Sequence, residues 1–67
     1  MKKYKVTASY LVEGLREVIY EVEAESFEDA KERGYELAED SGKIWVEVDS
    51  VEDVETGETF EYGGYNL

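Results

Sequence analysis

The spacing of apolar residues constrains the fold most, because its period changes along a chain of only 67 residues. Apolar and polar residues alternate between positions 4 and 12, and after Glu13 and Gly14 the alternation resumes from about position 16 to position 24. A period of two is typical of a strand with one buried face, and glycine between two such segments favours a tight turn. The first 24 residues therefore predict a β-hairpin.

The spacing then becomes that of a helix. Ser26 precedes Asp29 by three residues, so its hydroxyl can accept a backbone N–H at a helix N-terminus, where an acid is also favourable. A helix is expected from about position 27 until Ser41 and Gly42 end it. Its apolar side comprises Phe27, Ala30, Gly34, Leu37 and Ala38. Glycine is costly within a helix, so Gly34 predicts a close approach of the helix to an aromatic residue of the sheet.

Alternation returns after the helix. Segment 43–49 predicts a third strand, with Ile44, Val46 and Val48 on one face and Trp45, Glu47 and Asp49 on the other. Val51 is out of phase with this series, which indicates a bulge near Ser50 before the strand continues to position 54. A turn at Thr56 and Gly57 leads to a fourth strand at 59–62 with Phe60 and Tyr62 inward, and the glycine-rich segment 63–67 is expected to be a flexible tail.

The order of elements is therefore two strands, one helix and two strands within a single domain spanning 1–67. We expect an α+β fold in which a four-stranded antiparallel sheet, in ββαββ order, carries one helix packed on one face. If strand three pairs beside strand one, the spatial order is 2-1-3-4 and the helix forms a right-handed crossover.

The chain is strongly acidic, with 18 Asp and Glu residues against seven Lys and Arg, a net charge of -11 and no histidine. Segment 1–16 carries +3, whereas segment 17–67 carries -14. The nine aromatic residues and regular apolar spacing argue against disorder. A compact state of this charge repels itself, so the acidity either serves solubility or meets a basic partner.

Composition also restricts the chemistry. Without histidine and cysteine the usual nucleophile and base pairs cannot form, so we expect a non-enzymatic protein without a cofactor. The cluster Asp49, Glu52, Asp53 and Glu55 lacks the spacing of a calcium loop, so no metal site is expected. The lysines are too few for direct nucleic-acid binding, and no segment approaches the ~20 apolar residues of a membrane span. A cytoplasmic protein is expected.

Strand alternation places most candidate binding residues on the sheet face away from the helix. These residues are Glu17, Glu21, Glu23, Trp45, Glu47, Asp49 and Glu61, with Ile19 beside them. Carboxylates two residues apart on a strand are about 6.6 Å apart and neighbouring strands about 4.8 Å, so the array approaches the charge spacing of a nucleic-acid backbone. Like charges directly opposite across strands cost stability, which makes such an array unexpected without a function.

Two interpretations of this face remain open. An exposed tryptophan at position 45 on a charged face is a candidate interface anchor, because tryptophan is enriched at binding hot spots. The same residue could instead be covered by the tail or by a second copy in a homodimer, with the acidity serving only solubility. The acidic helix side at Glu28, Glu32, Glu36 and Glu39, with Tyr35 at its edge, is a second candidate surface.

Part of the sequence resembles a known family. Segments 3–7 and 21–26, followed by Glu28, Asp29 and Ala30, are similar to the small DpnD/PcfM-like proteins of restriction loci, phages and conjugative elements. The resemblance covers roughly the first 40 residues and implies a mobile-element setting, but no site residue. Size, acidity and element order also resemble several anti-CRISPR proteins. The leading hypothesis is an inhibitor that occupies the basic nucleic-acid-binding surface of a host defence enzyme, and the alternative is a small self-associating structural domain.

Overall fold

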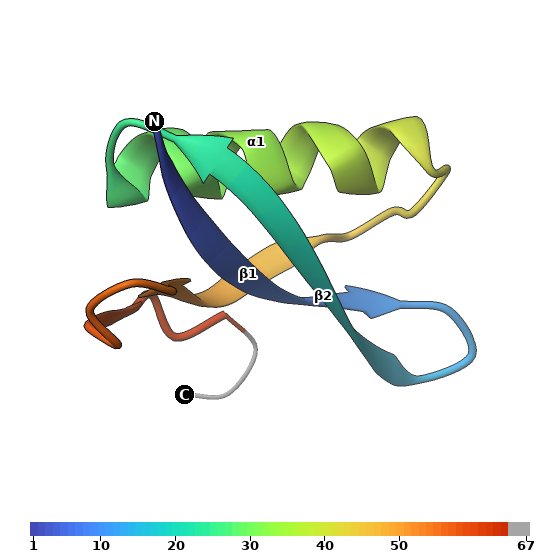
Figure 1. Cartoon of the computed structure of the whole chain (residues 1–67). Coiled ribbons are helices and arrows are strands. Elements are labelled where there is room, and N and C mark those ends of the chain that lie inside the picture. Colours follow the sequence, from blue (N-terminus) through green and yellow to red (C-terminus); the bar gives the residue numbers. More distant parts are fainter. Residues whose placement is uncertain (65–67) are drawn as a thin grey trace.

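A computed structural model describes residues 1–64 and confirms the expected order of elements. They are β1 (Lys2–Leu11), β2 (Leu15–Ala24), α1 (Phe27–Asp40), β3 (Glu47–Asp53) and β4 (Thr59–Glu61). The strands form one antiparallel sheet in the order β2-β1-β3-β4, and α1 lies across one face of it (Figure 1). The predicted α+β class and the 2-1-3-4 strand order are therefore confirmed.

Local sequence signals place the hairpin and the helix as expected. Strands β1 and β2 pair over their whole length, from Lys2 opposite Ala24 to Leu11 opposite Leu15. The turn between them uses positive φ at Glu13 (54°) and Gly14 (121°). At the start of α1 the backbone N–H of Asp29 donates to the Ser26 hydroxyl at 3.1 Å, which confirms the predicted helix cap.

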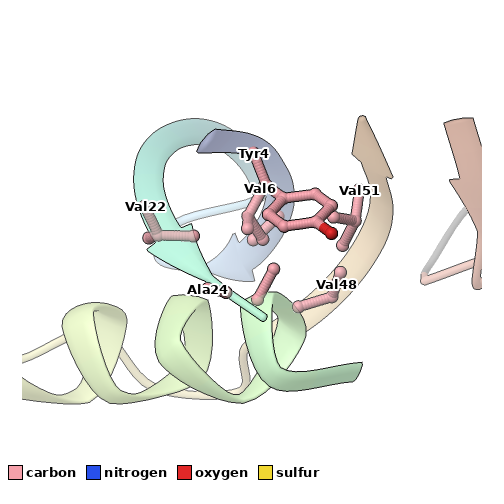
Figure 2. Packing of buried hydrophobic residues seen from close by; sticks show 8 residues of the cluster. Tyr4, Val6, Val22, Ala24, Val48 and Val51 are labelled. Atoms are coloured by element: carbon pink, nitrogen blue, oxygen red, sulfur yellow. The ribbon is translucent and has the colours of Figure 1, made fainter. Parts of the chain in front are cut away.

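The core lies between α1 and the sheet and consists mostly of small side chains. Its buried members are Tyr4, Val6, Ala8, Val22, Ala24, Ala30, Val48 and Val51. Figure 2 shows Val6, Val48 and Val51 gathered beside the helix. A Cβ atom built at Gly34 would lie 2.6 Å from Cγ1 of Val6, so the missing side chain is what allows this helix position to touch β1. The close approach predicted at Gly34 is present, but the contact is Val6 and not an aromatic residue.

A row of aromatic rings closes the core on the β4 side. Ring centroids are 5.2 Å apart for Tyr4 and Phe27, 6.0 Å for Phe27 and Phe60, and 4.8 Å for Phe60 and Tyr62. The ammonium group of Lys31 lies 4.5 Å from the Tyr62 ring centroid. Burial, with the nearby Glu28 carboxylate, raises the pKa of Tyr62. Phe60 takes the predicted side of β4, although 52% of its surface is exposed.

The predicted third strand begins too early. Strand β3 starts at Glu47, because Trp45 has a φ of 56°, which breaks the extended conformation. Ile44, expected in the core, is 61% exposed. The predicted bulge is present: Thr7 lies opposite Ser50, whereas the next residue of β1 lies opposite Val48. The extra residue is Asp49, and it allows both Val48 and Val51 to point into the core.

Asp53 organises the turn between β3 and β4. Its Oδ1 accepts backbone N–H groups of Glu55 at 2.9 Å and Thr56 at 3.3 Å, and its Oδ2 lies 3.4 Å from Nζ of Lys2. Burial by itself would raise the pKa of Asp53, but the two backbone N–H groups and the Lys2 ammonium outweigh it and lower that pKa. The turn is thus tied to the N-terminus of the chain.

The segment after β4 folds back onto the bulge. Backbone N–H groups of Tyr62 and Gly63 donate to the carbonyl of Asp49 at 2.8 Å and 3.2 Å. A Cβ atom at Gly64, where φ is 52°, would collide with the Asp49 carboxylate as it is placed, so a larger residue here would have to displace that side chain. The flexible tail was predicted over 63–67, and positions 65–67 lie outside the described residues.

Gly34→Ala is expected to destabilise the fold by up to about 2 kcal/mol, and each kcal/mol corresponds to roughly 4–8 °C in Tm. Overpacking against the stiff, buried Val6 costs about 1–3 kcal/mol, and the better helix propensity of alanine returns about 1 kcal/mol. Urea unfolding followed by circular dichroism measures the change.

The double variant Gly34→Ala with Val6→Ala supplies the matched test. Its destabilisation should be smaller than the sum of the two single changes, because the new methyl group occupies space that the shortened Val6 leaves. Glu32→Ala, at an exposed position of the same helix, should change stability by about 0.5 kcal/mol or less. Additive effects of the two core changes would contradict the assigned contact.

Candidate interaction surfaces

The sheet face away from α1 is not the continuous acidic array that the pattern predicted. Strand β1 lies between β2 and β3, so its lysines stand among the carboxylates. Lys3 is opposite Glu23, and Lys5 is opposite both Glu21 and Glu52. Basic residues therefore separate the acids of the two flanking strands, and the expected cost of like charges facing each other is avoided.

Two of the predicted site residues are engaged within the fold. The Ser9 hydroxyl donates to Oδ2 of Asp49 at 2.6 Å, and Ser9 itself is 2% exposed. The carboxylate of Glu47 accepts the Tyr35 hydroxyl at 3.0 Å, so it reaches toward α1 at the sheet edge. The Glu47 carboxylate therefore leaves the sheet face on which the alternation placed it, whereas Asp49 stays on that face, at the bulge.

A polar recess on the same face collects three of the predicted residues. Glu17, Asp49 and Glu61 line it together with Thr7, Ser50 and Gly63, and it encloses about 230 Å³. Among residues 1–64 no group of three or more acidic, histidine or cysteine side chains is arranged so that it could hold a metal ion. Oδ1 of Asp49 is buried in the recess and makes no hydrogen bond within the described chain.

Trp45 lies in the connection between α1 and β3, away from the sheet face where it was predicted. It is 70% exposed and follows the exposed Ile44. An apolar recess of about 290 Å³ separates this connection from the tip of the β1–β2 hairpin, with Tyr10, Leu11, Val12, Gly42, Lys43 and Ile44 around it. We call the exposed side chains here the apolar end: Leu11, Val12, Leu15, Ile44 and Trp45. Exposed apolar clusters of this kind mark interaction sites.

A groove lies between β2 and α1, and we call it the β2–α1 groove. It encloses about 510 Å³. Its lining residues are Met1, Glu21, Val22, Glu23, Arg33, Glu36, Leu37 and Asp40. Four acidic residues thus line the groove with three apolar ones, and its one guanidinium, that of Arg33, is paired with Asp29 at 3.3 Å. The backbone N–H of Glu25, together with Arg33, lowers the pKa of Asp29.

Sequence reasoning found part of this groove. It assigned Glu21 and Glu23 as binding residues, but it placed them with the wrong neighbours. It assigned Leu37 to the buried side of α1, whereas this residue is 40% exposed and lines the groove. The sequence did contain an indication of the groove: in the last turns of the helix the acidic Glu36 and Asp40 flank that leucine. Only the position of α1 over the sheet decides which strand they face.

Other functional classes receive no support from the described residues. Helix α1 is too short and too polar to cross a membrane, and it is the only helix among residues 1–64. No family model matches the chain, and searches of curated proteins and of solved structures returned no significant match. The function is therefore inferred from the surfaces of the protein.

Charge repulsion should make stability depend on salt. Raising NaCl from about 0.01 M to about 1 M shortens the screening length from about 30 Å to about 3 Å, so Tm should rise. In Lys5→Glu the rise should be steeper, because an acid then stands between Glu21 and Glu52. Differential scanning calorimetry measures both slopes, with Lys5→Gln as the intermediate case. A Tm that is independent of salt would refute the repulsion argument.

Proposed function

We propose that this chain is a non-enzymatic binding protein that occupies a basic, nucleic-acid-binding surface of another protein. The observation that carries the proposal is the β2–α1 groove, whose lining combines four acidic residues, Glu21, Glu23, Glu36 and Asp40, with the apolar Met1, Val22 and Leu37. Carboxylates around apolar surface suit lysine and arginine side chains, whose stems pack on carbon while their charged ends meet the acids. The net charge of -11 adds long-range attraction toward a basic target.

The target class that we propose is a host defence enzyme, as in anti-CRISPR or anti-restriction inhibition. Such enzymes hold nucleic acid in positively charged channels that recognise the backbone through its charge. The resemblance of segments 3–7 and 21–26 to DpnD/PcfM-like proteins supports a phage or mobile-element origin and action in the host cytoplasm. Glu52, which lies opposite Lys5 and outside the groove, contributes less to this proposal than the groove residues.

Inhibition assays on purified CRISPR effector nucleases and restriction endonucleases test the function. At least one enzyme should lose DNA binding and cleavage when the chain is added. The inhibition constant should increase about tenfold or more between about 50 mM and about 200 mM salt, because electrostatic binding of this kind weakens as salt is added. The double variant Glu21→Lys with Glu23→Lys should lose inhibition.

Glu32→Lys with Glu39→Lys is the matched control, because it reverses two exposed charges on α1 outside the groove. It should inhibit far better than the groove variant. Equal loss in both would indicate net charge without a defined surface. Inhibition of none of the enzymes, or inhibition that salt leaves unchanged, would contradict the proposal.

The apolar end favours a second candidate, a small domain that self-associates there. Leu11 and Ile44 line one recess and are 39% and 61% exposed, and Trp45, which follows Ile44 in the chain, is 70% exposed. Sedimentation velocity at micromolar concentration separates the two candidates. A dimer that Trp45→Ala dissociates supports self-association, whereas a monomer at all concentrations leaves the apolar end as a surface for other partners and favours the inhibitor.

A further inference from the structure

Strand β2 forms an outer edge of the sheet, and among residues 1–64 it pairs only with β1. The hydrogen bonds of β1 show which backbone groups point outward. The carbonyl of Lys3 accepts the N–H of Val54 at 3.1 Å, so the backbone polar groups of Lys3 face away from β2. Lys3 is opposite Glu23, and in an antiparallel ladder such a pair directs its polar groups away from each other. The N–H and C=O of Glu23 therefore point to the free edge.

The same alternation applies along the strand. Backbone groups of Glu17, Ile19 and Glu21 also point to the free edge, because polar groups alternate sides along a strand. Their side chains lie on the open face of the sheet, while Val22 turns toward α1 and lines the β2–α1 groove. A row of unpaired backbone groups over positions 17–23 thus runs beside an acidic groove. Such an edge is a template for another strand.

We propose that this edge binds an extended basic segment of the partner as a fifth, antiparallel strand. This proposal rests on the proposed function and specifies how the partner binds. Lysine or arginine of the segment lies opposite Glu17, Glu21 and Glu23, and an apolar residue lies opposite Ile19. The residues between them face α1, where they contact Val22 and Leu37. Backbone hydrogen bonds supply affinity, and the alternating side chains supply specificity.

Electrostatics favours a basic segment over a second copy of β2 as the strand that binds at this edge. Pairing two copies antiparallel about Ile19 places Glu17 of each against Glu21 of the other, and pairing them about Glu21 places that residue against its own copy. Like charges directly across strands are destabilising, and each chain already carries -11. A positively charged strand meets the same residues favourably.

A synthetic peptide tests the binding mode directly. The probe is acetyl-Gly-Lys-Val-Lys-Thr-Ile-Thr-Lys-Gly-amide, whose three lysines and isoleucine match the edge in antiparallel register. Isothermal titration calorimetry measures its affinity for the full chain. Heteronuclear NMR and amide hydrogen exchange locate it: the free-edge amides of Ile19, Glu21 and Glu23 should become protected.

N-methylation separates strand addition from simple attraction between charges. Methyl groups on the backbone nitrogens of the middle lysine and the isoleucine, which face β2 in this register, should weaken binding about tenfold or more. Methyl groups on the two threonine nitrogens, which face away, should leave the affinity within about twofold. Both peptides carry the same charge. Equal affinity of the two would overturn the proposal.

Changes in the chain give a second readout. The double variant Glu21→Gln with Glu23→Gln should bind the unmodified peptide about tenfold more weakly. The double variant Glu32→Gln with Glu39→Gln should lose less affinity for it. Peptide binding with the predicted protection, but no enzyme inhibited, would leave strand addition standing and overturn the defence-enzyme function. Inhibition that the peptide does not compete with, together with no protection of the edge amides, would leave the function standing and overturn strand addition.

Discussion

The contact between Gly34 and Val6 is the constraint on which the rest of the structure depends. Because the helix position lacks a side chain, α1 packs directly on the central strand β1, and the core can be filled by valines and alanines. A chain of this length cannot bury a large core, so close packing compensates for the small number of buried side chains. The position that this contact gives α1 also creates the β2–α1 groove, since the last turns of the helix extend beside the edge strand.

The order of the strands determines which charged side chains face each other across the sheet. The basic strand is central, so the acids of β2 and β3 face lysines and not one another. This arrangement lets the fold tolerate its charge on the open face. Of the β2 acids there, Glu17 lies opposite Ser9 and not a lysine, and the acids along α1 have no strand lysine opposite them. The anionic character of the chain is therefore concentrated where an edge and a groove are available to a partner.

Two different surfaces emerge from this arrangement. The β2–α1 groove combines acidic and apolar lining residues with the outer edge of β2, and a basic, extended partner is what we propose for it. The apolar end includes Leu11, Ile44 and Trp45. It lies at the tip of the β1–β2 hairpin, and Lys2 lies at the other end of that hairpin. Electrostatic attraction dominates at the first surface and burial of apolar area at the second, so salt acts on them differently.

The sequence by itself determined the hairpin, the capped helix and the bulge, because these depend on local spacing. Topological rules offered the order 2-1-3-4 only on the condition that β3 pairs with β1, and the tertiary structure met that condition. The sequence also determined that Glu21 and Glu23 share one side of a strand. Only the tertiary structure decided their neighbours: lysines across the sheet, and Glu36, Leu37 and Asp40 of the helix. Period-two alternation continued through Trp45, but a single residue at positive φ ended it, and this backbone conformation leaves no trace in apolar spacing. Packing between distant segments, which spacing does not encode, therefore created the site.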